Sequence, residues 1–211
     1  MLDETDPSKI IMPGYFIQVA EKTGKILDID RWVIAESIRL LAKTPDLNAI
    51  AVNISGRSFD DPNLPGYIRD HLIDAEVDPA RFMVELTETA AVSDLHDAQR
   101  FIESLHQTGC QVCLDDFGSG FSSFAYLKNL RADILKIDGI FIRDLPNDRD
   151  NQIFVKSIVD VARGMHKKTV AEFVEDAETL EMLRVLGVDL VQGYYLDMPQ
   201  ANHPAINNDN E

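Results

Sequence analysis

The chain has 211 residues, of which 45% are hydrophobic and 27% are charged, and acidic residues outnumber basic ones by 36 to 20. The formal net charge of −16 disfavours binding to a nucleic acid duplex or to an anionic membrane surface, and no apolar stretch is long enough to span a bilayer. These values are typical of one globular domain, on which an anionic ligand would need a bound cation.

The N-terminal residues carry acidic side chains such as Glu4 and Asp6, where a secretion signal would carry basic ones. The two cysteines, Cys110 and Cys113, form a single C-x-x-C pair at the start of an apolar run. A zinc site needs further ligands and a redox pair usually opens a helix, so we expect both thiols to pack in the core. We predict a cytoplasmic chain, whose parent protein is free to be membrane-anchored.

From about residue 29, short apolar runs rich in β-branched residues alternate with segments of helical period. An amphipathic segment around Trp32 and Leu40 comes first. The predicted strands cover residues 49–55, 82–87, 111–114, 134–137, 169–174 and 190–195. Between the later strands, the predicted helices cover residues 94–106, 151–165 and 177–186. Gly109 and Gly187 follow two of these helices as stop signals.

The alternation of strand and helix predicts a parallel sheet with helical crossovers. No glycine-rich phosphate loop follows any predicted strand, which disfavours an open nucleotide-binding sheet. Instead, a polar residue stands at the carboxyl end of every strand, and a barrel gathers these ends around one mouth. We therefore predict an α/β fold, a TIM-like (β/α)₈-type barrel with mostly parallel strands. The strand-end residues are Asn53, Glu85, Asp115 with Asp116, Lys136, Glu172 and Gln192.

Four carboxylates at one rim need neutralising cations or protons. Oxygen ligands in this number favour Mg²⁺, Mn²⁺ or Ca²⁺, and the lack of a strand-end histidine disfavours zinc. Two such ions would activate a water and stabilise the leaving oxygen of a phosphodiester, with a lysine beside them to orient the water or offset charge. A single acid after a strand more often caps a helix, so the prediction rests on the whole set.

The same strand ends carry a series of ungapped motifs. In order, they are N-x-S at 53–55, E-x-T-E at 85–88, D-D-F-G-S-G at 115–120, L-K-I-D at 135–138, A-E-F-V-E at 171–175 and Q-G-Y at 192–194. Together they resemble the motifs of EAL domains, bacterial phosphodiesterases that linearise cyclic di-GMP to pGpG. The resemblance implies an EAL-type barrel domain over residues 1–199 that is incomplete at its N-terminus. Residues 200–211 are polar and rich in Asn and Asp, which predicts a flexible tail.

The resemblance also implies a role for each motif residue. Lys136 would hold the attacking water, and Glu172 would serve as a metal ligand and is also a candidate general base. Glu88 would steady the loop that follows Asp115. Metal, as Mg²⁺ or Mn²⁺ in a two-ion site, would be bound by Asn53, Glu85, Asp115, Asp116 and Glu172.

The ligand implied by the resemblance is cyclic di-GMP, which Glu175 and Gln192 would contact. EAL domains also form homodimers and often follow other signalling domains, so the resemblance implies both for the parent protein.

The sequence departs from the family pattern at three places. Phe173 replaces the Gly of A-E-G-V-E, and L-D-M-P at 196–199 replaces F-S-R-P. The E-A-L strand, which carries a metal-binding glutamate, does not occur ahead of Tyr15, so we expect a fragment that lacks its first strand and has weak activity by itself. Two alternatives stay open, a receptor that binds cyclic di-GMP without cleaving it and a pure interaction module. The retained acids favour the enzyme.

Overall fold

The computed structural model describes residues 11–120 and 124–200. The acidic residues at positions 4 and 6, and all but the first residue of the predicted tail, lie outside these ranges. Among the described residues, no helix is both long and apolar enough to cross a membrane.

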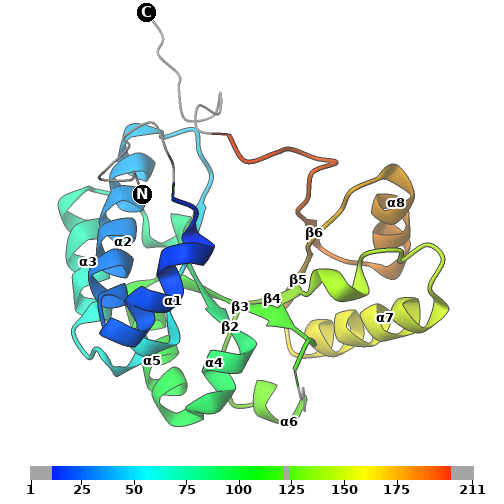
Figure 1. Ribbon diagram of the computed structural model, residues 1–211, viewed down its shortest axis with the longest axis horizontal. Helices are drawn as coiled ribbons and strands as arrows, with labels where there is room; N and C mark the ends of the chain where they lie inside the picture. The colour runs from blue at the N-terminus through cyan, green and yellow to red at the C-terminus, as the bar shows by residue number, and fades with distance from the viewer. Residues whose placement is uncertain (1–10, 121–123, 201–211) are drawn as a thin grey trace, which may run out of the picture.

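A curved parallel sheet forms the centre of the molecule (Figure 1). Its six strands lie in sequence order, and each pairs in parallel with the next. They are β1 (Ile50–Asn53), β2 (Phe82–Thr87), β3 (Gln111–Phe117), β4 (Ile134–Ile137), β5 (Lys168–Ala171) and β6 (Leu190–Val191). Because consecutive strands are neighbours and parallel, all the carboxyl ends lie along one rim, as the predicted barrel-type fold requires.

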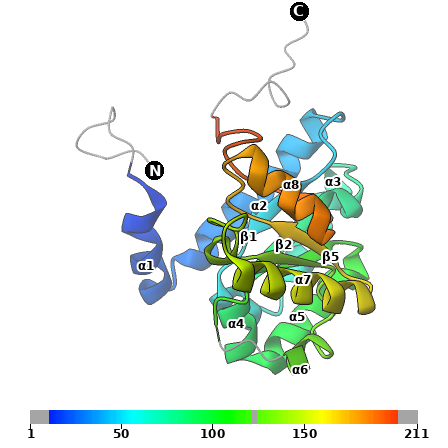
Figure 2. The same ribbon diagram turned by 90° about the vertical axis from the view of Figure 1, so that its right-hand side faces the viewer.

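Two helices precede the first strand, and the first of them stands away from the sheet, whereas the later helices follow the strands and pack around the sheet (Figures 1 and 2). The α-helices are α1 (Pro13–Thr23), α2 (Ile26–Lys43), α3 (Leu64–Asp74), α4 (Glu88–Ser93), α5 (Leu95–Thr108), α6 (Phe124–Leu127), α7 (Arg149–Gly164) and α8 (Ala177–Leu186). Three 3₁₀ turns, η1 (Gly56–Asp60), η2 (Pro79–Arg81) and η3 (Gly139–Phe141), lie in the connections.

The boundaries of the helices follow from local capping. Asp94 accepts a hydrogen bond from the Asp97 amide at the start of α5, and Gly109 ends that helix with a left-handed φ of 92°. Gly187 ends α8 in the same way, with φ 84°. Both predicted stop signals are therefore confirmed. Helix α3 was not predicted; its first turn contains Pro65 and Gly66, which more often mark a loop.

The core lies between the sheet and its helical cover. On β2, Val84 and Leu86 are fully buried toward this core, so Glu85 between them points to the opposite face. Both Cys110 and Cys113 are buried, as predicted from the apolar run that contains them. The alternation on β2 is what sends an acidic side chain to the inside of the curve.

Candidate active site at the carboxyl ends of the strands

A buried lysine lies at the centre of the rim. Lys136 on β4 is 4% exposed, and its Nζ atom lies within salt-bridge distance of three carboxylates. The distances are 3.1 Å to Glu85 Oε2, 3.0 Å to Asp115 Oδ1 and 2.9 Å to Glu172 Oε1. The acids come from β2, from β3 and from the residue after β5, so the structure brings together side chains that are far apart in sequence.

The cluster has more negative than positive charge. Burial by itself lowers the pKa of the Lys136 amine, but the hydrogen bond to Glu172 and the charges of Glu85 and Asp115 outweigh it, so the pKa is raised overall. The lysine therefore stays protonated. Burial raises the pKa of Glu85 and of Glu172, and the nearby ammonium offsets this only in part. One lysine does not neutralise the group.

A β-bulge in β3 brings two neighbouring aspartates to the same rim. Leu114 pairs with Leu135 and Phe117 with Ile137, so β3 has one more residue than β4 over this span. The extra residue allows Asp116 to take a left-handed φ of 55°. In a regular strand, adjacent side chains would point to opposite faces.

The bulge has a direct consequence for the carboxylates. One oxygen from each of Asp115, Asp116 and Glu172 can be chosen so that all three lie within 4.8 Å of one another. The pKa of Asp116 is raised as well. Burial is the largest cause, and the negative charge of Asp115 is the next. The three acids thus form one group of oxygen donors whose negative charge exceeds the single positive charge of the neighbouring Lys136.

Asn53 extends this row of side chains on β1. It pairs in register with Glu85, and a hydrogen bond from its side chain lowers the pKa of that acid. Its side chain is exposed and is not one of the three tightly grouped donors. Asn53 therefore lies at the edge of the acidic cluster and contacts it by its hydrogen bond to Glu85.

Glu88, at the start of α4, contacts the loop that follows β3. It is 4% exposed and accepts hydrogen bonds from the Gly118 amide, at 2.8 Å, and from the Tyr126 hydroxyl. Gly118 has φ 99°, and a Cβ there would lie 2.9 Å from the ring of Phe141. Only glycine fits this turn. Tyr126 was missed by the sequence analysis, because it lies 38 residues from Glu88 and outside every motif.

A second bulge follows β5. The Gln192 amide donates to Ala171 O at 2.8 Å, and the Val174 amide donates to Gln192 O at 3.1 Å. Two residues, Glu172 and Phe173, lie between these bonds where a regular parallel ladder has one. Phe173 takes up the difference with a left-handed φ of 53°.

A pocket of about 280 Å³ opens beside this second bulge. The two predicted ligand contacts, Glu175 and Gln192, are both exposed and both line it, next to Glu172 of the acidic cluster. The other lining residues are Phe173, Gly193, Tyr194 and Pro199. The pocket is thus continuous with the rim that carries the acids.

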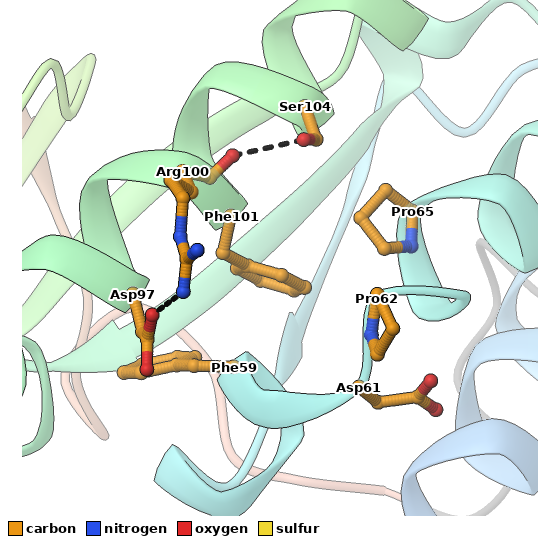
Figure 3. A pocket seen from close by; sticks show the side chains of 8 residues that line it. All are labelled: Phe59, Asp61, Pro62, Pro65, Asp97, Arg100, Phe101 and Ser104. Atoms are coloured by element: carbon orange, nitrogen blue, oxygen red, sulfur yellow. Dashed lines mark hydrogen bonds and ion pairs between the residues drawn. The ribbon is translucent and has the colours of Figure 1, made fainter.

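A larger pocket, of about 430 Å³, lies among the outer elements η1, α3 and α5 (Figure 3). Phe59, Phe101 and two prolines surround it, and Asp97 pairs with Arg100 at its edge. None of its lining residues belongs to the acidic cluster. The rim of the sheet is therefore the better candidate for a catalytic site.

Comparisons with known proteins agree on one family. The model of the EAL domain matches residues 3–199. "Cyclic di-GMP phosphodiesterase PdeF" of Escherichia coli (strain K12) is 38% identical over 208 residues, which cover 96% of this chain and 27% of that protein. Among the curated relatives it matches, the chain spans about a quarter of the length.

Two solved structures extend the comparison. "PaMucR Phosphodiesterase, c-di-GMP complex" superposes with a TM-score of 0.84 at 38% identity, covering 90% of this chain and 78% of that one. "Klebsiella pneumoniae BlrP1 pH 9.0 manganese/cy-diGMP complex" has a TM-score of 0.75 at 27% identity, covering 79% of this chain and 43% of that one. Both contain cyclic di-GMP by name, and one contains manganese.

Proposed function

The chain belongs to the EAL domain family, and from this membership we propose that it carries the residues that hydrolyse cyclic di-GMP to linear pGpG with the help of divalent metal ions. The observation that carries the proposal is the buried Lys136 surrounded by Glu85, Asp115 and Glu172 at the rim of the sheet. We take cyclic di-GMP as the substrate because the names of the relatives specify it.

The donor set fits a hard divalent cation. The grouped atoms of Asp115, Asp116 and Glu172 are all carboxylate oxygens, and no histidine or cysteine is part of this group among the described residues. The raised pKa values of Glu85, Asp116 and Glu172 indicate that added positive charge would be favourable there. We assign Mg²⁺ or Mn²⁺ to the carboxylates of Glu85, Asp115, Asp116 and Glu172. Asn53 would be a further oxygen ligand. When bound, such ions make a water nucleophilic and stabilise the leaving oxygen of a phosphodiester.

Lys136 acts as a fixed positive charge in this proposal. Because its pKa is raised, it stays protonated and donates hydrogen bonds, so it cannot serve as the general base. Its position between Glu85 and Glu172 suits it to hold the attacking water and to offset negative charge in the transition state.

Glu172 is the proposed proton acceptor. Burial raises the pKa of its carboxyl, which makes the carboxylate a stronger base than an exposed glutamate. It also lies at the border between the acidic cluster and the pocket with Glu175 and Gln192. We assign these last two side chains to hydrogen bonds with the dinucleotide.

The test is a product analysis of the protein that carries this chain. We expect chromatography to show conversion of cyclic di-GMP to pGpG with Mn²⁺ and none after a chelator removes the metal. Binding of cyclic di-GMP with no product in excess Mn²⁺ would instead favour the receptor. If the protein neither binds cyclic di-GMP nor forms pGpG, the enzyme and the receptor are both excluded.

A further inference from the structure

Phe173 has a backbone conformation that its side chain does not favour. Its φ of 53° lies in the left-handed region, where glycine is unstrained and a bulky residue is an outlier. The family pattern has glycine at this position. The ring is 42% exposed, so burial gives only part of the stabilisation that an aromatic side chain could provide. Strain without full burial favours a role for the ring outside the core.

Two residues of the segment that follows β4 hold the ring in place. The guanidinium carbon of Arg143 lies 4.5 Å from the centroid of the Phe173 ring, well within the range of a cation–π interaction. The ring also lies directly against the backbone of Gly139, where a Cβ would be only 2.1 Å from a ring carbon. Arg143 forms no ion pair with any of the described residues, and its guanidinium instead lies over the Phe173 ring.

The ring lines the pocket that contains Glu175 and Gln192. The backbone around it is tightly fixed, because a Cβ on Gly193 would lie 2.2 Å from Val174 O and the Tyr195 amide donates to that same oxygen at 3.0 Å. The pocket therefore has a rigid frame, and the orientation of the phenyl ring is set by Arg143 and Gly139.

We propose that Arg143 is a positioning residue, which holds the Phe173 ring as a fixed aromatic wall for a planar base of the bound nucleotide. The inference rests on the proposed function, because it takes the pocket as the nucleotide site. An aromatic face stacks with any nucleobase, and a ring that is already immobilised loses less side-chain entropy when the base arrives. A guanidinium on the ring provides that immobilisation without itself lining the pocket.

A double-mutant cycle tests the proposal. Cyclic di-GMP would be titrated calorimetrically, without added metal to avoid turnover, into wild type, Arg143→Ala, Phe173→Gly and the double variant. We expect each single variant to raise Kd about tenfold, with unchanged Tm for Arg143→Ala. The double variant should bind no more weakly than Phe173→Gly, because Arg143 acts through the ring. Arg143→Lys should restore part of the affinity, and Arg184→Ala on α8 is the matched control.

The outcomes separate the two proposals. A wild-type protein that neither binds cyclic di-GMP nor forms pGpG in excess Mn²⁺ would refute the proposed function and this inference with it. Wild-type binding that Arg143→Ala leaves unchanged would overturn the positioning role alone, and so would additive losses in the double variant. A lowered Tm with unchanged affinity in Phe173→Gly would show that the ring serves packing only, which would also overturn it.

Discussion

At the scale of single residues, Glu85 shows how the site opposes the stability of the fold. Its side chain is buried at the centre of the sheet, and burial raises its pKa despite the hydrogen bond from Lys136. A carboxyl whose pKa is raised on folding binds its proton more tightly in the folded state. Stability is therefore lost as the pH rises from the ordinary carboxyl pKa through the raised one.

We expect Glu85→Gln to stabilise the metal-free protein at neutral pH. The amide keeps a hydrogen-bond acceptor for Lys136 but removes the buried charge, so the free energy of unfolding should rise at pH 7. The gain should disappear near pH 4, where both proteins are neutral at this position. Urea denaturation at the two pH values measures it, and an equal or lower stability at pH 7 would contradict this explanation.

Cys113 on β3 should be chemically inert in the folded protein. Burial, followed by the negative charge of Glu85, raises the pKa of its thiol to about 12, and the thiolate is the reactive form. We expect no alkylation of Cys113 by iodoacetamide at pH 8, and full alkylation after unfolding in urea. Mass spectrometry of the labelled peptide distinguishes the two, and rapid labelling of the native protein would show that the site opens to solvent.

At the scale of elements, the bulge in β3 is what places Asp116 beside Asp115. Asparagine tolerates the left-handed backbone, whereas a β-branched residue does not. We therefore predict that Asp116→Asn folds at least as stably as wild type, while Asp116→Val is less stable by about 1–3 kcal/mol. Chemical denaturation of the two variants without metal gives the difference, and equal stabilities would show that the bulge does not constrain this residue.

The strands show which parts of the fold can be predicted from the sequence. The predicted strands at 82–87 and 134–137 match β2 and β4, because their apolar pattern ends where the ladder ends. The prediction for β3 stopped at residue 114, yet the strand continues through Asp115 and Asp116 to Phe117. The acids interrupt the apolar pattern, and a bulge depends on pairing with β4, which no local pattern records.

The opposite error occurred at the last two strands. The predicted runs 169–174 and 190–195 end in the structure at Ala171 and Val191. Apolar or aromatic residues return after Glu172 and after Gln192, but the left-handed turn at Phe173 ends the regular ladder. The convergence of the strand ends was predictable from order alone, whereas the contacts of Tyr126 and Arg143 depend on tertiary packing.

At the scale of the whole molecule, a chain with net charge −16 has to assemble four carboxylates in one place. Bound cations should therefore stabilise the fold. We predict that Mn²⁺ raises Tm, and that Asp115→Asn weakens the calorimetric Kd for Mn²⁺ by at least about tenfold because it removes a charged ligand. Asp160→Asn, which changes an exposed acid on α7, should bind Mn²⁺ like wild type. Equal affinities in all three proteins would place the metal elsewhere.

The central claim is that the acids around Lys136 perform the hydrolysis, and the turnover of Glu172→Gln tests it most directly. The protein that carries this chain would be assayed with saturating cyclic di-GMP and Mn²⁺. As a matched control, Glu181→Gln changes an exposed glutamate of α8 that pairs with Arg184. We predict that Glu172→Gln lowers kcat by about 100-fold or more, since it removes a base and a metal ligand together, while Glu181→Gln keeps the wild-type rate. Wild-type turnover in Glu172→Gln would contradict the assignment of this rim as the catalytic site.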